Sequence, residues 1–319
     1  MIDLKIVVLK FGGIAASTKN NREYILKIVQ KLKDKKILIV ISAMGKMGFP
    51  YATDTLNNLI VEEFSTNKEK DRLLACGEII SSVVLANQLS ESKVKCYALS
   101  VKECGIRYEN EYLIDVDTIK QMFKEYDVLV MPGFICLDKK DEIRTLNRGG
   151  SDLSACIVAQ GLECKNVFLF KDVDGVYPFY SAGVTNLKPL MNISYDEALM
   201  MYDIGYKIIQ KDAIEYARYH KLKIIVCNYI TSKVGTIISN DSSQNEVTGL
   251  SFTKDTIKVA AFNLDQIKLD IDKMLFENRI FCKKIVKKDN FLEFTFGINQ
   301  IQIAKKIIIN KYFNKYLIQ

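Results

Sequence analysis

A short glycine-rich segment, residues 145–152, combines residue types that can bind an anion. It reads Thr-Leu-Asn-Arg-Gly-Gly-Ser-Asp, and an apolar, helix-compatible run follows at 153–159. Adjacent glycines permit a tight turn and leave backbone N–H groups free at the start of a helix. Arg148 adds a forked cation suited to a carboxylate or phosphate, Ser151 can cap the helix, and Asp152 falls in its first turn. An ordinary capped turn explains the same residues, so the rest of the chain must decide between the two interpretations.

Two more loops with small residues follow runs that are typical of buried strands. Residues 4–9 are mostly apolar and β-branched and lead into Lys10-Phe11-Gly12-Gly13, and residues 37–41 lead into Ser42-Ala43-Met44-Gly45. A helix-compatible segment at about 21–32 separates them. Strand, glycine loop, helix and strand is the order of a parallel sheet, whose ligands collect beyond the carboxyl ends of the strands. The residues expected at that edge are Lys10, Gly12, Gly13, Ser42 and Gly45.

Further elements of the same kind extend along the chain to about residue 238. Strand patterns occur at 94–99, 127–131, 166–170, 223–227 and 235–238. Helix-compatible stretches occur at 53–64, 68–89, 152–160, 195–202 and 207–219. Glu78 lies in the second of these helices among mostly apolar residues, where a carboxylate either forms a structural salt bridge or faces a wet pocket.

Two charged positions in the second half of the chain have competing interpretations. Asp172-Val-Asp-Gly175 resembles the start of an EF-hand loop, but the twelfth position is Gly183, so we expect a turn and no calcium site. Lys207 follows Gly205 at the expected start of the helix 207–219, where an ammonium group opposes the helix dipole unless an anion is close. Placement on the surface is the alternative for this lysine.

A polar segment, residues 239–246, predicts a linker between two domains. Beyond it we expect strands at 256–262, 280–286 and 291–296 and helices at 266–277 and 300–316. This β-α-β-β-α order builds an antiparallel sheet with helices on one face, a module that commonly binds ligands or other subunits. The predicted domains are therefore residues 1–240 and 247–319.

The composition excludes several classes of function. The 319 residues are 49% hydrophobic and 26% charged, which is ordinary for a globular protein. We see no apolar run of membrane-spanning length and no signal peptide, and therefore expect a cytoplasmic protein. The eight cysteines form no C-x-x-C pair, and the single histidine, His220, argues against His-based zinc chemistry and a Ser/His triad. The net charge of +7 is spread along the chain and indicates a solvated lysine-rich surface, so no nucleic-acid partner is expected.

Glycine loops, lysines and acidic residues at one sheet edge suit phosphoryl transfer, where catalysis consists mostly of positioning and charge neutralisation. The sequence contains no G-x-x-x-x-G-K-[ST] motif and no dinucleotide fingerprint. Neither a P-loop enzyme nor an NAD enzyme is therefore expected.

Seven segments occur in the order seen in aspartate kinases of the amino acid kinase family, which the chain resembles over about residues 4–238. They are Lys10-Phe-Gly-Gly13, Ser42-Ala-Met-Gly-Lys46, Cys76-Gly-Glu78, Pro132-Gly-Phe134, Thr145-Leu-Asn-Arg-Gly-Gly-Ser-Asp152, Asp172-Val-Asp-Gly175 and Ser194-Tyr-Asp-Glu197. The stretch from Met47 to Asp54 is similar to the diaminopimelate-sensitive aspartokinases of spore-forming bacteria.

The resemblance implies an α/β fold, a three-layer α-β-α sandwich with a mainly parallel central sheet, followed by a small α+β domain that resembles a single ACT domain. It implies that ATP phosphorylates the β-carboxylate of L-aspartate, the first step toward diaminopimelate, lysine, threonine and methionine. Mg²⁺ would be held mainly by the nucleotide phosphates, with no metal site of protein residues. A homodimer or higher homo-oligomer and an amino-acid effector are implied as well. Because the family usually carries two ACT domains, we expect a weak response to lysine or none.

The resemblance also implies a role for each matching residue. The catalytic set would be Lys10, which stabilises the phosphoryl group, Asp152, which orients the lysines, and Lys207. Aspartate would be held by Ser42, Glu78, Arg148 and Ser151, with Glu78 at its ammonium group and Arg148 at its α-carboxylate. The nucleotide would be bordered by Lys10, Gly12, Gly13, Gly45, Lys171, Asp172, Tyr177 and Lys207.

The chain departs from the family pattern around the nucleotide. Ile14-Ala15 replaces Thr-Ser, Lys171 replaces a threonine, residues 178–183 replace an acidic-Pro-Arg segment, and Gln210-Lys211 replaces His-Pro or Ser-Pro. Two rivals therefore remain beside a working aspartate kinase. One is a kinase of the same fold acting on N-acetylglutamate, glutamate or a nucleoside monophosphate, and the other is a catalytically silent regulatory subunit.

Overall fold

The computed structural model describes residues 5–146, 149–180 and 187–317. Within it the chain forms two compact units, and each is made from two separate segments. The first comprises Met1–Asp174 and Glu215–Val234, and the second comprises Gly175–Ile214 and Gly235–Gln319.

A parallel sheet organises the first unit. Its strands lie in the order β11-β9-β1-β2-β6-β3, and all neighbouring pairs are parallel. The bounds are β1 Ile6–Phe11, β2 Lys36–Ile41, β3 Cys96–Ala98, β6 Val128–Pro132, β9 Asn166–Lys171 and β11 Lys223–Asn228. The strand predictions from the apolar runs are confirmed with shifts of one or two residues at their ends. Because β1 and β9 are neighbouring strands inside the sheet, the loops that follow them open side by side at the carboxyl edge.

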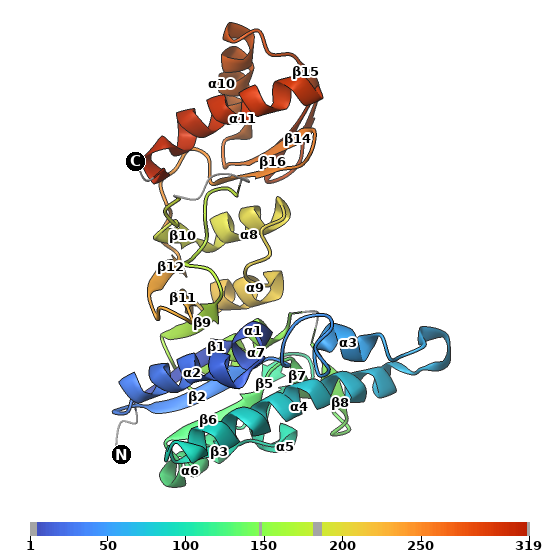
Figure 1. Ribbon diagram of the computed structural model, residues 1–319, viewed down its shortest axis with the longest axis vertical. Helices are drawn as coiled ribbons and strands as arrows, with labels where there is room; N and C mark the ends of the chain where they lie inside the picture. The colour runs from blue at the N-terminus through green and yellow to red at the C-terminus, as the bar shows by residue number, and fades with distance from the viewer. Residues whose placement is uncertain (1–4, 147–148, 181–186, 318–319) are drawn as a thin grey trace. The chain divides into compact units, whose positions relative to one another are not determined.

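Helices cover both faces of this sheet. On one face α2 (Lys19–Lys31) and α4 (Asn67–Glu91) pack against alternate strand residues such as Leu9, Ile39 and Val130 (Figure 1). On the other face α7 (Ser151–Gly161) contacts β1, β2 and β9. The expected three-layer α-β-α sandwich with a mainly parallel sheet is therefore confirmed. Shorter elements of this unit are α1 (Gly13–Ala16), α3 (Thr53–Asn57), η1 (Glu62–Phe64), α5 (Val101–Cys104) and α6 (Val116–Glu125).

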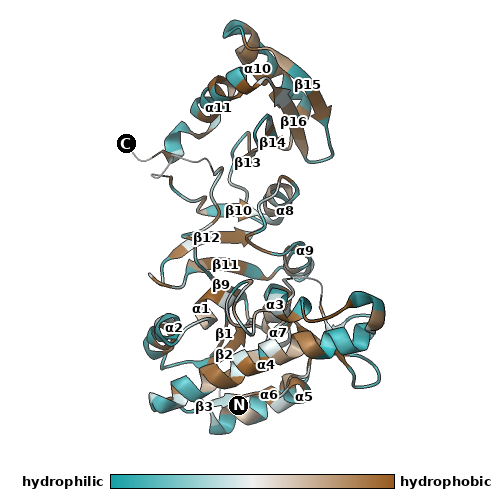
Figure 2. Cartoon of the chain, turned by 45° about the vertical axis from the view of Figure 1, so that its right-hand side comes forward, coloured by the Kyte–Doolittle hydropathy of each residue, from teal (hydrophilic) through white to brown (hydrophobic). Residues whose placement is uncertain are grey.

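The long helix α4 requires a correction. An 18-residue window in Asn67–Glu91 has a mean hydropathy of 1.4, so one apolar segment does have the length and composition of a membrane span. However, 56% of that window is buried inside the chain, as in the core helix of a globular protein. Figure 2 shows polar and apolar stretches alternating along this helix. Its first turn is fixed by a capping box in which Thr66 and Glu69 bond each other's backbone N–H groups.

A second, small sheet was not predicted from the sequence. It has the order β5-β4-β7-β8, with β4 Arg107–Tyr108, β5 Tyr112–Leu113, β7 Ile135–Leu137 and β8 Ile143–Thr145. Strands of two or three residues are too short to give a periodic pattern. The hairpin β7–β8 matters for the site because its second strand ends at Thr145, the first residue of the glycine-rich segment.

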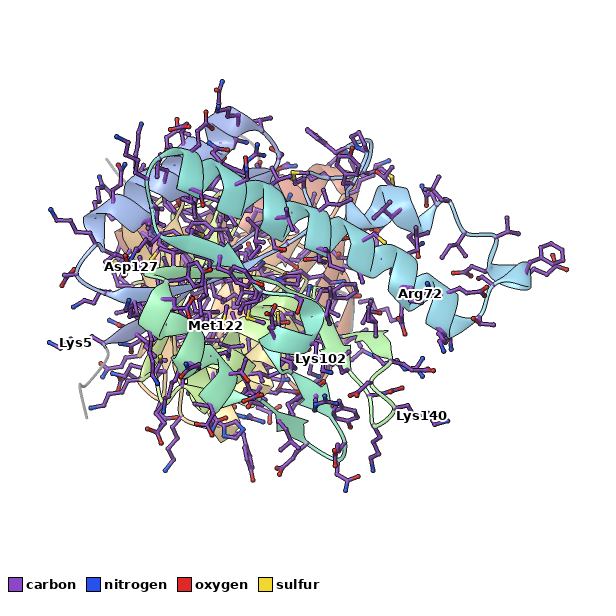
Figure 3. All side chains as sticks on the ribbon, turned by 90° about the horizontal axis from the view of Figure 1, so that it is seen from below. Lys5, Arg72, Lys102, Met122, Asp127 and Lys140 are labelled. Atoms are coloured by element: carbon purple, nitrogen blue, oxygen red, sulfur yellow. The ribbon has the colours of Figure 1, made fainter. Side chains whose placement is uncertain are left out.

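Charged side chains surround the first unit without gathering in one place. Lys5, Lys102 and Lys140 are exposed on separate segments of the chain, and Figure 3 labels them at different places. Arg72 and Asp127 mark two more parts of the same periphery. This distribution fits the solvated lysine-rich surface that the sequence indicates.

The second unit holds a four-stranded antiparallel sheet and a smaller parallel pair. The sheet has the order β13-β14-β16-β15, and α10 and α11 pack against it through residues such as Ile271 and Ile308. The bounds are β13 Gly249–Phe252, β14 Thr256–Ala260, α10 Leu264–Glu277, β15 Cys282–Lys287, β16 Phe291–Phe296, α11 Ile298–Phe313 and η2 Asn314–Tyr316. The expected module is present, but β13 was missed because Gly249 opens it and only four residues form it.

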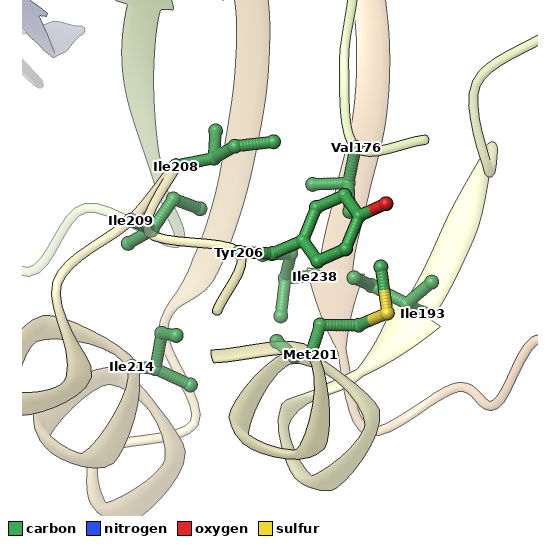
Figure 4. A pocket seen from close by; sticks show the side chains of 9 residues that line it. Val176, Ile193, Met201, Tyr206, Ile208, Ile209, Ile214 and Ile238 are labelled. Carbon is green, nitrogen blue, oxygen red and sulfur yellow. The ribbon is translucent and has the colours of Figure 1, made fainter. Parts of the chain in front are cut away.

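The remaining part of the second unit contains β10 (Asn192–Ser194), which pairs in parallel with β12 (Val234–Ser239), and α8 (Tyr195–Asp203). Aliphatic side chains from these elements surround a small cavity, together with Tyr206 (Figure 4). The Tyr206 hydroxyl donates to the Leu250 carbonyl at 2.9 Å, so the polar end of this ring is satisfied.

Two helix predictions were wrong in extent. The stretch 53–64 forms only α3, which ends at Asn57, and the 3₁₀ turn η1. The helix predicted at 207–219 is α9, which begins at Lys211. Lys207 therefore lies in a loop four residues before that helix and does not stand in its first turn.

Candidate active site

A buried carboxylate, Asp152, lies between two lysines in the first unit. Its oxygens are 2.8 Å from the Lys10 ammonium and 2.8 Å from the Lys171 ammonium. The exposed fractions of the side chains are 6% for Lys10, 4% for Asp152 and 15% for Lys171. The structure thus brings together three residues that the sequence placed in separate loops.

The sheet register explains how the three meet. Lys10 of β1 lies beside Leu169 of β9, so Lys10, Leu169 and Lys171 point to the same face of the sheet. That face is the one covered by α7, whose second residue is Asp152. The two lysines come from neighbouring strands and the carboxylate comes from the first turn of the helix above them.

The two lysines determine the charge of Asp152. Burial alone would raise the pKa of this carboxyl, but the charges of Lys10 and Lys171 and their hydrogen bonds lower it to about 2. Asp152 is therefore an anion throughout the physiological range. Burial lowers the pKa of Lys171, as does the charge of Lys10, while Asp152 opposes both effects.

Glu78 is a second buried carboxylate, but no cation of the described residues forms an ion pair with it. It is 2% exposed, and its Oε2 atom has no hydrogen-bond partner among the described residues. Burial raises its pKa to about 8, against the opposing influence of the Ala43 backbone, the Lys10 charge and Thr53. Among the described residues Glu78 forms no ion pair, and whether it faces a ligand stays a prediction.

The glycine loops after β1 and β2 pack directly on each other. The Gly45 N–H donates to the Gly13 carbonyl at 2.8 Å, and a Cβ atom on Gly13 would lie 2.5 Å from the Gly45 oxygen. Gly45 has a φ of +90°, a conformation that side chains rarely adopt. The close approach leaves a pocket beside α1 and the end of β9, lined by Gly12, Gly13, Ile14, Ala15, Lys46, Phe170, Lys171, Asp172 and Tyr229.

Ser42 and Ser151 meet across the sheet edge. Their hydroxyl oxygens are 2.8 Å apart, and the Ser81 hydroxyl of α4 donates to the Ser42 carbonyl at 2.7 Å. The prediction that Ser151 caps α7 was wrong, since Gly150 is the N-cap residue and no side chain caps this helix. The Ser151 hydroxyl is directed to Ser42 because Ser151 lies inside the first turn.

Not all predicted site residues belong to this cluster. Arg148 lies outside the described residues. Tyr177 and Lys207 belong to the second unit, where the Lys207 ammonium lies 5.9 Å from the centre of the Tyr202 ring. Their predicted roles stay predictions.

Sequence reasoning missed three features of this region. Lys46 and Tyr229 line the pocket, and Lys171 pairs with Asp152. The pairing carries a recognisable signal, because Lys171 follows the buried β9 pattern and has the same parity as Val167 and Leu169. The sequence around Tyr229 gives no such signal, because the position of Tyr229 depends on the pairing of β11 with β9.

The model of the amino acid kinase family matches residues 5–228, which include every strand of the parallel sheet in the first unit. The chain belongs to the amino acid kinase family. Its expected resemblance to aspartate kinases is confirmed by a curated relative, aspartokinase 1 of Bacillus subtilis. That relative is 28% identical over 331 residues, which cover 96% of this chain and 81% of the relative.

Two solved structures share the fold. E. coli aspartokinase III in complex with aspartate and ADP has a TM-score of 0.64 at 19% identity, covering 91% of this chain and 78% of that one. UMP kinase from Ureaplasma parvum has a TM-score of 0.55 at 16% identity and covers 75% of this chain and all of its own. At these identities the likeness concerns the fold alone, and one fold can carry different functions.

Proposed function

We propose that this chain is an aspartate kinase, which transfers the terminal phosphoryl group of ATP to the β-carboxylate of L-aspartate and forms 4-phospho-L-aspartate and ADP. The single observation that carries the proposal is the pairing of a buried Lys10–Asp152 ion pair with the unpartnered buried carboxylate of Glu78. Phosphoryl transfer needs the first and a free amino acid needs the second. The curated relative and the matched structure with aspartate and ADP support the same substrates.

The reaction requires little covalent chemistry from the protein. A β-carboxylate oxygen of aspartate attacks the γ-phosphorus, and the bond from that phosphorus to the β,γ-bridging oxygen breaks, so the electron pair leaves with ADP. Lys10 would neutralise charge on the moving phosphoryl group, and Asp152 would hold the Lys10 ammonium in position through their ion pair. The backbone N–H groups of the loop at Gly12 and Gly13, which line the pocket, would receive phosphate oxygens.

Glu78 supplies the selectivity for an amino acid. A substrate ammonium group at its unpartnered Oε2 atom would stabilise the ionised carboxylate that burial disfavours in the free protein. Arg148 would bind the α-carboxylate, and the neighbouring Ser42 and Ser151 hydroxyls would orient the substrate. Tyr177 and Lys207 would border the nucleotide.

Mg²⁺ belongs to the proposal through the nucleotide. Over residues 5–146, 149–180 and 187–317, no group of three His, Cys, Asp or Glu side chains is placed to hold a metal ion. An ion bound mainly by the nucleotide phosphates needs no such group of side chains. Asp172 is an exposed carboxylate on the pocket wall that is available to this ion. When bound, the ion would neutralise charge on the phosphates.

The test is ATP- and Mg²⁺-dependent formation of an acyl phosphate, trapped as the hydroxamate, with aspartate and glutamate as parallel substrates. We expect turnover with aspartate and none in the Asp152→Asn variant. Turnover with glutamate alone, or with UMP in a parallel ADP-release assay, would assign the chain to another activity of the same fold. A folded protein that is silent with all three would support the regulatory subunit.

The other proposals concern the assembly and the setting of the protein. We expect a homodimer or higher homo-oligomer, which light scattering coupled to gel filtration would measure. Because the C-terminal module resembles a single ACT domain, we expect a weak response to lysine or none, and lysine titration of the assay tests it. A cytoplasmic location is proposed because the curated relatives are metabolic enzymes named aspartokinase. The domain boundary between residues 240 and 247 also stays a prediction.

A further inference from the structure

A second pocket of the first unit lies at the other end of the parallel sheet from the candidate active site. It opens where α7 and α9 (Lys211–Tyr219) end and where β9 and β11 begin. Its volume is about 450 Å³, which is enough for a small molecule. All of its lining residues belong to the first unit, and they are Gln160, Glu163, Cys164, Lys165, His220, Lys221, Leu222 and Lys223.

Three lysines give this pocket a positive charge. Lys165 precedes β9 and Lys223 opens the neighbouring strand β11, where the Lys223 N–H donates to the Lys165 carbonyl at 3.1 Å. Lys221 lies two residues before Lys223, and all three side chains are exposed. In the part of the chain that the structure describes, no carboxylate forms an ion pair with them, although Glu163 lines the same pocket. Three ammonium groups around one cavity, against a single carboxylate, attract an anion.

The ends of the two helices do not account for these lysines. A cation often stabilises the carbonyl end of a helix, either by capping a carbonyl or through the helix dipole. Here the Cys164 N–H donates to the Ala159 carbonyl of α7 at 2.8 Å. The Leu222 N–H donates to the Ala217 carbonyl of α9 at 2.9 Å. Backbone donors therefore satisfy these terminal carbonyls, and a lysine is not needed as a cap.

Aromatic rings stand beside the lysines. His220 lines the pocket, and the centre of its ring is 4.3 Å from that of Tyr216 and 4.9 Å from that of Tyr219. The Tyr219 side chain is 83% exposed, so much of its ring is open to a ligand. The Tyr216 hydroxyl donates to the Gln160 side chain at 3.3 Å and holds this amide in the pocket wall. The pocket thus combines cations that suit phosphate oxygens with rings that suit stacking on a base.

We propose that this pocket binds a nucleoside monophosphate, whose phosphate contacts Lys165, Lys221 and Lys223 and whose base stacks on Tyr219. The strand β9 separates this pocket from the candidate active site, because Lys165 precedes its first residue and Lys171 is its last. The ligand is therefore bound at a place that takes no part in the proposed phosphoryl transfer. Its binding does not depend on which substrate the kinase uses.

The experiment uses His220 as a reporter, because it is the single histidine of the 319 residues. The imidazole Cε1–H signal of the full chain is followed by proton NMR during titration with AMP, with inorganic phosphate and with adenosine. We expect a saturable shift with AMP at millimolar concentration. Phosphate and adenosine should each bind about tenfold more weakly or less, because each lacks one of the two kinds of contact.

Four variants separate the charge from the ring. Lys165→Met and Lys221→Gly should each weaken AMP about tenfold, since one charge-assisted contact is lost. Lys221 has a φ of +54°, a conformation that glycine favours, so Lys221→Gly is expected to keep the turn. Tyr219→Ala should weaken AMP and leave phosphate unchanged. Lys95→Met, at an exposed lysine that precedes β3 at the same edge of the sheet, should alter neither ligand. Thermal unfolding of each variant shows whether it is folded.

The outcomes decide the assignment and keep it apart from the proposed function. A His220 shift that persists in folded Lys165→Met and Lys221→Gly would come from another nucleotide site, and the pocket would not be one. An affinity for phosphate equal to that for AMP would overturn the nucleoside assignment, as would the absence of any shift. If aspartate is not phosphorylated but AMP binding depends on the pocket lysines, this site stands and the proposed function fails.

Discussion

Glu78 shows how burial can prepare a side chain for a ligand. A carboxyl that is 2% exposed with one unpartnered oxygen is held mostly in its neutral form near pH 7, because its pKa is about 8. The ammonium group of a substrate reverses this preference by supplying the missing cation. Recognition of the amino group is then coupled to the release of a proton.

This coupling gives the first prediction. Binding of aspartate at pH 7 should release about one proton as Glu78 ionises. Calorimetry in two buffers of different ionisation enthalpy measures the number of protons. Glu78→Gln should abolish the release and weaken binding, whereas Glu63→Gln, at an exposed carboxylate of η1, should alter neither. Proton release that persists in Glu78→Gln would assign it to another group.

The same carboxyl predicts a pH dependence of stability in the unliganded protein. A folded-state pKa of about 8, against 4.5 for an unperturbed glutamate, means that the folded protein binds the Glu78 proton more tightly. Its contribution to stability is complete below pH 4.5 and is lost as pH rises through 8. Denaturant unfolding of Glu78→Gln, which stays neutral, should therefore show a smaller loss of stability from pH 6 to 9. Parallel curves for the two proteins would contradict the raised pKa.

Substitution of Asp152 should lower both the stability and the activity of the protein. Asp152→Asn leaves two buried lysines without their anion, so we expect a loss of about 3 kcal/mol in the free energy of unfolding. Activity should fall by at least about 100-fold, because Lys10 is no longer held in place. Denaturant unfolding and the hydroxamate assay measure the two effects. An active Asp152→Asn enzyme would remove Asp152 from the site.

At the scale of elements, α4 links a stabilising cap to a functional residue three turns away. The capping box of Thr66 and Glu69 fixes the start of the helix, and Glu78 lies within its buried middle. Thr66→Ala should lower the free energy of unfolding by about 1 kcal/mol, since one backbone N–H loses its acceptor. Thr66→Ser, which keeps the hydroxyl, is the matched control. Activity should be unchanged in both, and a fall in kcat without a fall in stability would show that the cap acts on Glu78.

Elements also explain what the sequence could and could not predict. Strands β1, β2, β6, β9 and β11 were predicted because buried parallel strands read as continuous apolar runs. The loops at Lys10 and Ser42 followed from them, since carboxyl ends of parallel strands meet at one edge. The parity of β9 predicts the face of the sheet on which Lys171 lies, but the residue it meets there also depends on the register of β9 against β1. Lys207 was misplaced because the apolar period of α9 continues into the loop before it.

At the scale of the molecule, the second unit depends on contacts between distant segments. Glu197 of α8 is fully buried and accepts a hydrogen bond from the Ser194 N–H at 2.7 Å. It accepts two more from Ser243, one from the backbone N–H and one from the hydroxyl. A carboxylate in the first turn of α8 thereby fixes a loop that lies 46 residues further along the chain.

We predict that Glu197→Ala lowers the free energy of unfolding by about 2 to 4 kcal/mol, because three donors lose their acceptor in a buried place. Glu246→Ala removes an exposed carboxylate from the end of the same loop and should be nearly neutral. Differential scanning calorimetry of the two variants tests the difference. Equal unfolding temperatures would mean that water replaces the lost carboxylate.

The anchoring of residues 239–246 affects how the protein can be divided. Composition marks this stretch as the natural place to cut, yet Ser243 holds Glu197 and the Asn245 amide donates to the Tyr316 hydroxyl at 3.0 Å. Downstream, the Ser251 hydroxyl donates to the Ile204 carbonyl at 2.6 Å. A recombinant fragment that ends at residue 240 would expose the buried face of α8 and remove the two Ser243 donors from the Glu197 carboxylate. Such a fragment should aggregate or be degraded, and a fragment of residues 247–319 would lack the other half of the same contacts.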